Sequence, residues 1–479
     1  MFRPVQSALA LLVLCVAAGL PATNAVGQEA RPDGTQAAAM AEADAAYEGG
    51  DYAAAFELLK PAAESGVPLA QYRLGMMYGL GRGVEQDLGL AVEWLTKAAE
   101  QGEAQAQLRL GKLHLDGLGV KEDPAAARRW LLAAAEQGLA AAQFELSVIY
   151  SRGIGVEEDN AEAARWLQAA AEGGHAEAQF FLAFNHSRGT GVAKDEAAAL
   201  SWYRAAAEQG MIDAQAVLGS LYLNGIGTER DTDEALKWLR LAAEQESPAS
   251  QSNLGYMYAT GTGVAQDHGE AAKWYRRAAE NGLPRAQAAL ALLHETGQGL
   301  VQDYEAAAEW YRRAARTGYE PAQVKLGQML AQGRAAAQDR SDAAEWVHKA
   351  ALAGDAAALA WLERAASEEV TAAQARLAHV LTSGDGVPRD EDRALSLYRA
   401  AAESGDAFAQ RELALRYAKG EGVEQDYLEA HKWANLAAAA GDEEARKSRD
   451  LFAQLMTPEQ LAEAQAMARQ WTQRSQAGE

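Results

Sequence analysis

The side chains that could carry out catalysis or bind a metal show no recognisable catalytic spacing in this sequence. Its 479 residues contain no HExxH zinc motif, no G-x-S-x-G nucleophile motif and no phosphate-binding G-x-x-x-x-G-K-[ST] loop. The histidines His114, His186 and His294 occupy a recurring position that tyrosine fills at Tyr78 and Tyr150. Because each of the three lies in a different copy of the recurring pattern, they cannot converge on one ion. We therefore predict no catalytic residue, no cofactor and no metal site.

Acidic side chains are abundant, but they recur at regular intervals. The chain has 67 acidic and 44 basic residues, which gives a net charge of −23. Regular spacing favours helix caps and solvated helix faces over a carboxylate pair for acid–base catalysis. A nucleic acid or an anionic membrane surface would require a basic face. We therefore expect no nucleic-acid partner and no peripheral binding to anionic lipid.

The segment 1–25 has the features of an export signal. Arg3 gives a positive start, residues 8–20 form an apolar run, and Thr23-Asn24-Ala25 offers small residues before a cleavage site. This run is too short for a membrane-spanning helix, which needs about 20 residues. We expect an exported protein of the periplasm or cell envelope, with no integral membrane segment once the signal is removed.

Cys15 is the only cysteine and lies inside this predicted signal. A lipid anchor on Cys15 is an alternative, but Leu14 stands where a lipoprotein signal has a small residue. Without the signal the chain has no thiol, so no disulfide, cysteine metal site or cysteine nucleophile is expected. Its stability must come from packing.

Tryptophan recurs every 36 residues along most of the chain, and glutamine and aspartate series that include Gln71 and Asp87 keep the same spacing. Several residue types in constant register over eight copies indicate tandem repeats. We predict a structural role for the tryptophans, which would fill the seam between repeats; a platform for carbohydrate or aromatic ligands is the alternative. The series is Trp94, Trp130, Trp166, Trp202, Trp238, Trp274, Trp310 and Trp346.

Each copy has the pattern of two short helices. In one copy, apolar or small residues from Ala70 to Tyr78 follow a helical period, and Gly81 and Gly83 would end that helix. Asp87 then stands where a helix N-cap belongs. One such hairpin cannot bury both its faces, so neighbours must stack. We predict an all-α fold, a right-handed α-solenoid of about ten 36-residue helix-turn-helix repeats with terminal capping helices.

The pattern A-x-x-Q-x-x-L-G-x-x-Y…G-x-G-V…D…A-x-x-W-x-x-x-A-A-x-x-G resembles the Sel1-like repeat family, a relative of the tetratricopeptide repeats. Stretches such as AQYRLGMMYGLGRGVEQDLGLAVEWLTKAAEQG carry the resemblance, which runs from about Ala37 to Gly441. It implies an adaptor that holds protein complexes together and, for an exported bacterial member, work in the cell envelope. It implies no catalytic residues.

The 36-residue spacing breaks once, because Trp361 follows Trp346 well before the spacing would place the next tryptophan. The segment 355–371 lacks the glycine loop, and we expect no capping aspartate before Trp361. We interpret it as one extra helix, which forms either a hinge between two stacks or part of a fused long helix; neutral decay of a repeat is the alternative to a functional bend.

The expected organisation follows from these signals. It is a signal peptide at 1–25, a disordered linker at 26–36, an N-terminal capping tetratricopeptide-like hairpin at 37–68, eight Sel1-like repeats at 69–354, an extra helix or hinge at 355–371, two further repeats at 372–441 and C-terminal capping helices at 442–479.

Candidate binding residues are those that vary between copies on the stripe expected to line a concave groove. Two adjacent copies hold Phe144, Phe180, Phe181 and Phe184, which are half of the eight phenylalanines. Aromatic residues together with arginine are typical of protein-binding hot spots, although these phenylalanines could instead thicken the core. The predicted partner-binding residues are Phe181, Phe184, Arg152, Arg188 and Tyr256.

The sequence therefore favours a non-enzymatic scaffold or adaptor of the bacterial cell envelope that binds a protein or peptide in its groove. Two alternatives stay open. One is a regulator of a periplasmic sensor or of a polysaccharide-export complex, and the other is an accessory of a cell-wall hydrolase.

Overall fold

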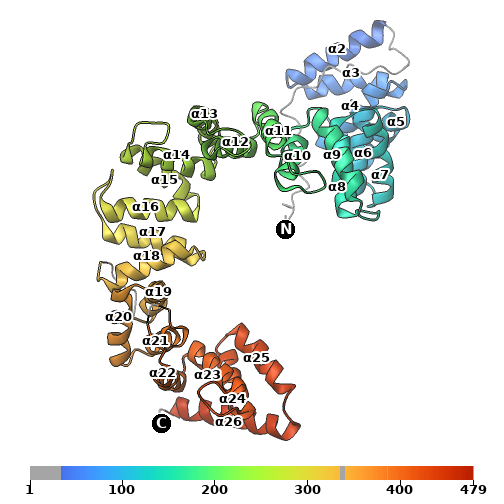
Figure 1. The fold of residues 1–479 in the computed structure, drawn as a ribbon. Helices are drawn as coiled ribbons and strands as arrows, with labels where there is room; N and C mark the ends of the chain where they lie inside the picture. The colour runs from blue at the N-terminus through green and yellow to red at the C-terminus, as the bar shows by residue number, and fades with distance from the viewer. Residues whose placement is uncertain (1–33, 335–339, 386, 478–479) are drawn as a thin grey trace. The chain divides into compact units, whose positions relative to one another are not determined.

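The computed structural model describes residues 34–334, 340–385 and 387–477, and within these ranges the chain forms α-helices and no β-strand (Figure 1). The prediction of an all-α fold is confirmed. The helices are α2 (Gly34–Glu48), α3 (Tyr52–Glu64), α4 (Pro68–Leu80), α5 (Leu88–Glu100), α6 (Ala104–Asp116), α7 (Pro124–Glu136), α8 (Ala140–Arg152), α9 (Asn160–Glu172), α10 (Ala176–Arg188), α11 (Glu196–Glu208), α12 (Ile212–Asn224), α13 (Thr232–Glu244), α14 (Pro248–Thr260), α15 (His268–Glu280), α16 (Pro284–Thr296), α17 (Tyr304–Arg316), α18 (Glu320–Ala331), α19 (Arg340–Leu352), α20 (Ala356–Ser367), α21 (Thr371–Ser383), α22 (Glu391–Glu403), α23 (Ala407–Lys419), α24 (Tyr427–Ala439), α25 (Glu443–Ala453) and α26 (Pro458–Ala477).

The helices belong to two compact units, one that ends at Ala242 and one that begins at Ala243. Within each unit, a helix packs both on its hairpin partner and on the next hairpin. In the first unit α5 contacts α4 and α6, and in the second unit α15 contacts α14 and α16. Each hairpin is therefore held by its neighbours in the chain, which is how a solenoid is stabilised.

Local capping chemistry sets the helix ends. The Asp87 carboxylate accepts a hydrogen bond from the Leu90 N–H at 2.9 Å and caps α5. Gly81 has φ 66°, a left-handed conformation that ends α4 and that a residue with a Cβ adopts only with strain. Both predicted roles are confirmed here. Asp339, a later member of the aspartate series, lies outside the described residues.

Small residues let the two helices of a hairpin approach closely. A Cβ at Gly75 of α4 would lie 2.9 Å from Leu95 Cγ and 3.2 Å from the Ala91 carbonyl oxygen, both on α5. Contacts this short are not compatible with close packing of carbon atoms. The glycine therefore determines how near α4 and α5 can lie.

The recurring glutamine ties one repeat to the next. The Gln71 side chain of α4 donates to the carbonyl oxygen of Ala63 at 3.1 Å, near the end of α3. Gln107 of α6 repeats the bond to Ala99 of α5 at 3.0 Å. These amides satisfy carbonyl groups that a helix end leaves without an intrahelical partner. Sequence reasoning identified the series but not this hydrogen bond.

The tryptophans of the 36-residue series pack between hairpins. Trp166 is buried in a cluster with Leu131 and Leu146, whereas Trp94 is half-buried against the cluster of α2, α3 and α4. A cation lies over the face of several rings, as Lys97 does at 4.0 Å from the Trp94 ring centroid. The indole rings thus contribute apolar area to the seams between repeats.

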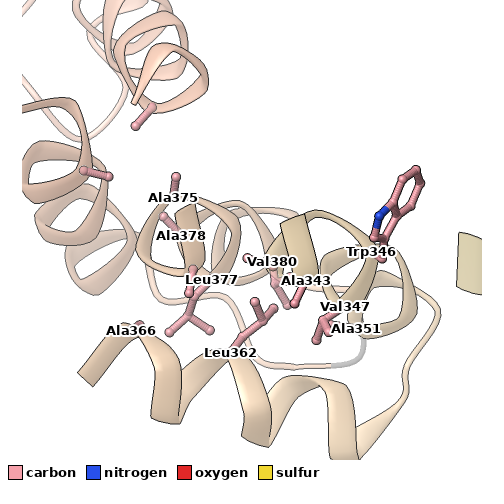
Figure 2. Packing of buried hydrophobic residues seen from close by; sticks show 14 of the residues in the cluster. Ala343, Trp346, Val347, Ala351, Leu362, Ala366, Ala375, Leu377, Ala378 and Val380 are labelled. Carbon is pink, nitrogen blue, oxygen red and sulfur yellow. The ribbon is translucent and has the colours of Figure 1, made fainter. Parts of the chain in front are cut away.

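The segment at the break in spacing is a separate helix, α20. Asp355 accepts a hydrogen bond from the Ala358 N–H at 2.8 Å and caps it, so the expectation of no capping aspartate was wrong. The aspartate was missed because it directly follows Gly354, without the usual loop. Leu362 is fully buried and points from α20 toward α19 and α21 (Figure 2). Because turns separate α20 from both neighbours, it is not part of a fused long helix.

Both ends of the described chain carry helices outside the regular pattern. The helices α2 and α3 are joined by a turn at Gly49-Gly50-Asp51, within the segment 37–68 for which the sequence predicts a hairpin. Residues 34–36 of the expected linker already belong to α2, and residues 1–33, including the predicted signal, lie outside the described residues. Thr457 and Gln460 exchange the two hydrogen bonds of a capping box at the start of α26, which lies within the segment 442–479.

Candidate functional site

A hollow of about 470 Å³ opens in the first unit, between the hairpin of α8 and α9 and the following helix α10. We call it the α8–α10 hollow. Its wall combines apolar side chains with small polar ones. The lining residues are Phe144, Ser147, Val148, Ser151, Arg152, Asn160, Ala163, Ala164, Leu167, Phe181, Asn185, Thr190 and Gly191.

The hollow exists because one interhelical loop lies away from the preceding repeat. In the two preceding interhelical loops, the second glycine packs on the first residue of the second helix of the repeat before it. A Cβ at Gly119 would lie 2.4 Å from the carbonyl oxygen of Leu88, which begins α5, and a Cβ at Gly155 would lie 2.5 Å from the Cβ of Pro124, which begins α7. At Gly191 the nearest atom is Ala164 Cβ, at 3.8 Å. The loop after α10 therefore leaves the start of α9 uncovered.

Two phenylalanines supply the apolar wall. The rings of Phe144 on α8 and Phe181 on α10 are stacked, with centroids 6.0 Å apart and planes 20° apart. Phe180 packs edge-on against Phe181 and against Tyr203 of α11. Phe181 nevertheless keeps 38% of its surface exposed. The cluster therefore thickens the core, as the alternative expected, and also presents one ring to solvent.

His175 extends this stack. Its ring lies 4.7 Å from the Phe144 ring, and its side chain also accepts the N–H of Ala178 at the start of α10. Burial lowers the pKa of His175 below its usual value of 6.5. The imidazole is therefore neutral at pH 7 and packs as an aromatic ring, not as a cation.

Arg152 is the single charged residue among the described residues that line the α8–α10 hollow. It is exposed and ends α8, next to Gly153. The Glu158 carboxylate lies outside the lining, where it accepts a hydrogen bond from the Asn160 amide at 3.1 Å. The hollow thus offers an apolar wall and one guanidinium group.

The other predicted binding residues lie elsewhere. Phe184 and Arg188 pair with each other on α10, with the guanidinium carbon 4.9 Å from the ring centroid, and neither lines the hollow. Tyr256 is 47% exposed on α14, in the second unit. The structure therefore brings together two of the five predicted residues, Phe181 and Arg152, at one site.

The second unit contains a buried polar and aromatic cluster that the sequence did not predict. His348 of α19 and His379 of α21 are joined by a hydrogen bond of 3.0 Å between Nε2 and Nδ1. Phe408 of α23 lies edge-on to both rings, and the Arg376 guanidinium lies 4.1 Å from the Phe408 ring centroid. His348 lies on the second helix of its repeat and His379 on the first helix of the following one, so the two share no repeat position.

Metal binding finds no support in the described part of the chain, where no group of three or more histidine, cysteine, aspartate or glutamate side chains could hold an ion. None of the helices in that part is both long and apolar enough to span a membrane.

The model of the Sel1 repeat matches eleven segments, at residues 39–67, 68–103, 104–139, 140–175, 176–211, 212–247, 248–283, 284–319, 320–355, 371–406 and 407–442. The chain belongs to the Sel1 repeat family. The predicted resemblance and the α-solenoid fold are thereby confirmed. The count exceeds the predicted ten because part of the expected N-terminal cap also matches, and the unmatched residues between 355 and 371 form α20.

A solved structure supports the same classification. The chain is similar to c5321, a protective antigen present in uropathogenic Escherichia coli strains that displays an SLR fold, with 34% identity and a TM-score of 0.58 over 87% of this chain and 94% of that one. A Sel1 repeat protein from Oxalobacter formigenes is 33% identical over 50% of this chain and 99% of its own, with a TM-score of 0.46. No curated protein matches the sequence. Sel1 repeat proteins are generally non-catalytic scaffolds for protein interaction.

Proposed function

We propose that this Sel1 repeat protein is a non-enzymatic scaffold of the cell envelope that binds a protein partner at the α8–α10 hollow. The observation that carries the proposal is the coincidence of an exposed Phe181 ring and a single arginine, Arg152, in a hollow between two repeats. Aromatic and arginine side chains dominate the binding energy of many protein interfaces.

The location in the envelope is supported by the segment 1–25, whose charge and apolar run fit an export signal. It is also compatible with the similarity to c5321, which is described as a protective antigen. A regulator of a periplasmic sensor or of an export complex would use the same hollow, so the identity of the captured partner decides between these roles.

Site-specific photocrosslinking in cells tests the proposal. A photoreactive benzoylphenylalanine replaces Ser151, which is exposed and lines the hollow. The matched control carries the same residue at Ser201, which is exposed on α11 and outside the lining. We expect a discrete adduct from position 151 that mass spectrometry identifies as an envelope protein, and none of it from position 201.

A second substitution separates binding from folding. We expect Phe181→Ala to reduce the adduct at position 151 while the Tm stays within a few degrees, because Phe181 is already partly exposed. Ile226→Ala, which removes another exposed apolar side chain of the first unit, should leave the adduct unchanged. Adducts of equal yield at positions 151 and 201, or none at either, would contradict the proposal.

A further inference from the structure

We infer that the α8–α10 hollow accepts a partner segment in which an aromatic side chain and a carboxylate lie a few residues apart, with the ring against Phe144 and Phe181 and the carboxylate on Arg152. This inference rests on the proposed function and specifies the chemistry of the partner. It makes the site selective for one kind of peptide sequence, not for apolar surface in general.

The aromatic stack forms the apolar half of the α8–α10 hollow. Phe144 and Phe181 lie nearly parallel, and the neutral His175 ring continues the stack behind Phe144. A stack that ends in a ring with 38% exposed surface has room for one more aromatic group on or beside it. Aromatic pairs favour such offset or edge-on contacts. The volume of about 470 Å³ is sufficient for one large side chain and adjoining backbone.

The charged and polar side chains of the lining form the polar half of the hollow. Arg152 is its one charged residue among those described, and Ser147, Ser151, Asn160, Asn185 and Thr190 are neutral. A guanidinium group matches the two oxygens of a carboxylate and can bind them as a pair. The chain as a whole carries a charge of −23, so most of its surface repels an acidic segment. A lone cation in the hollow therefore fixes where such a segment can bind.

The helix geometry sets the spacing within the partner segment. Phe144 and Arg152 are both on α8 and are eight residues apart, which corresponds to about 12 Å along a helix at 1.5 Å per residue. An arginine side chain on a helix leans toward the N-terminus and so shortens this span. An extended peptide advances about 3.3 Å per residue, so the ring and the carboxylate should be two to four residues apart.

The chain's own N-terminal stretch does not meet this description. Residues 26–33, Val-Gly-Gln-Glu-Ala-Arg-Pro-Asp, contain acidic groups but no aromatic side chain. A partner of separate origin is therefore the occupant that fits both halves of the hollow.

Synthetic peptides with blocked ends test the inference against the full chain. The probe carries Trp-Gly-Ser-Asp between Gly-Ser flanks and a fluorescent label, and binding is followed by anisotropy to millimolar peptide. Two control peptides replace Asp by Asn or Trp by Ala. From the strength of charge-assisted hydrogen bonds, we expect the Asn peptide to bind about tenfold more weakly than the probe.

Variants of the protein test separately how the polar half and the apolar half of the hollow contribute to peptide binding. Arg152→Gln should bind the Asp and Asn peptides equally, whereas Arg230→Gln, which removes an exposed arginine of the first unit outside the lining, should keep the difference. Phe181→Ala should weaken both Trp peptides in parallel. Circular dichroism and the Tm establish that each variant is folded.

Three results would overturn the inference: no binding of the probe at millimolar concentration, equal binding of the Asp and Asn peptides by the unsubstituted protein, or an Asp preference that persists in Arg152→Gln. A partner that still crosslinks through position 151 in any of these cases would leave the proposed function intact and refute only the chemistry assigned to the partner.

Discussion

At the scale of single residues, the buried histidine pair of the second unit has consequences for stability. Burial, together with repulsion from His379, Arg376 and Lys349, lowers the pKa of His348 to about 3. Burial also lowers the pKa of His379, although the nearby Glu412 opposes the shift and the arginines Arg376, Arg416 and Arg411 favour it. Both rings are thus neutral at pH 7, and a neutral imidazole can donate one N–H to the other ring.

The pH dependence follows from proton binding. In the unfolded chain a histidine has a pKa near 6.5, so below that pH the unfolded state binds more protons than the native state. The free energy of unfolding must therefore fall as the pH drops below about 6.5, and it continues to fall toward the native pKa of about 3. Above pH 7 the pair contributes no pH dependence.

His348→Gln tests this contribution, because glutamine is neutral at every relevant pH. We expect the Tm of the unsubstituted protein to fall more steeply than that of the variant between pH 7 and pH 5, even where the variant is less stable at pH 7. Parallel Tm curves for His348→Gln and the unsubstituted protein would refute the assignment.

At the scale of helices, the glutamine series explains why the repeat needs this residue type. Gln107 is 5% exposed, and its bond to Ala99 joins two repeats in a place where water does not reach. Gln137 of the next helix end also donates to Gln107 at 2.8 Å. The Ala99 carbonyl oxygen also accepts the Gly102 N–H at 3.1 Å, so the glutamine contributes one further hydrogen bond, which typically stabilises a protein by about 0.5–1.5 kcal/mol.

Gln107→Leu should therefore lower the stability by about 0.5–1.5 kcal/mol, because leucine keeps the volume but removes one of the hydrogen bonds to the Ala99 carbonyl oxygen, which keeps the Gly102 N–H as a donor. Gln302 makes the same kind of bond, to the Glu295 carbonyl oxygen at 2.9 Å, but it is exposed. Gln302→Leu should cost no more than about 0.5 kcal/mol, since water replaces the donor. Thermal unfolding measures the stability of both variants. Equal losses of stability would show that the contribution of this hydrogen bond does not depend on its burial.

Features determined by short-range chemistry could be predicted from the sequence. Caps such as Asp87 and turns such as Gly81 depend on neighbouring residues, so their repetition was enough to locate the helices. The α8–α10 hollow was different. Its loop carries the same glycine pattern as the others, and only the coordinates reveal that Gly191 lies away from the start of α9.

The candidate binding residues were therefore only partly predictable. The gathering of phenylalanines in two adjacent repeats indicated the right region, but not which rings stay exposed. Phe181 faces the hollow, whereas Phe184 is paired with Arg188 one turn further along α10. The histidine pair was hidden because His348 and His379 lie on a second and a first helix of different repeats, so comparison between repeats does not align them.

At the scale of the whole molecule, the net charge of −23 is distributed over a stack of helices that is stabilised by contacts between neighbours. Many ion pairs join residues three or four apart on one exposed helix face, as Lys273 and Glu270 do at 2.6 Å. Such exposed pairs contribute little to stability, because water and salt screen them. Repulsion among the excess carboxylates acts over longer distances and opposes the compact state.

Salt should therefore stabilise this protein. Raising NaCl from about 10 to about 150 mM shortens the screening length from about 30 to about 8 Å, which weakens the repulsion between repeats more than the contacts within ion pairs. We expect the Tm to rise over this range, by the same amount in KCl as in NaCl because the effect is one of ionic strength. A Tm that falls with salt would show that the ion pairs outweigh the excess negative charge, and a constant Tm would show that the two effects cancel.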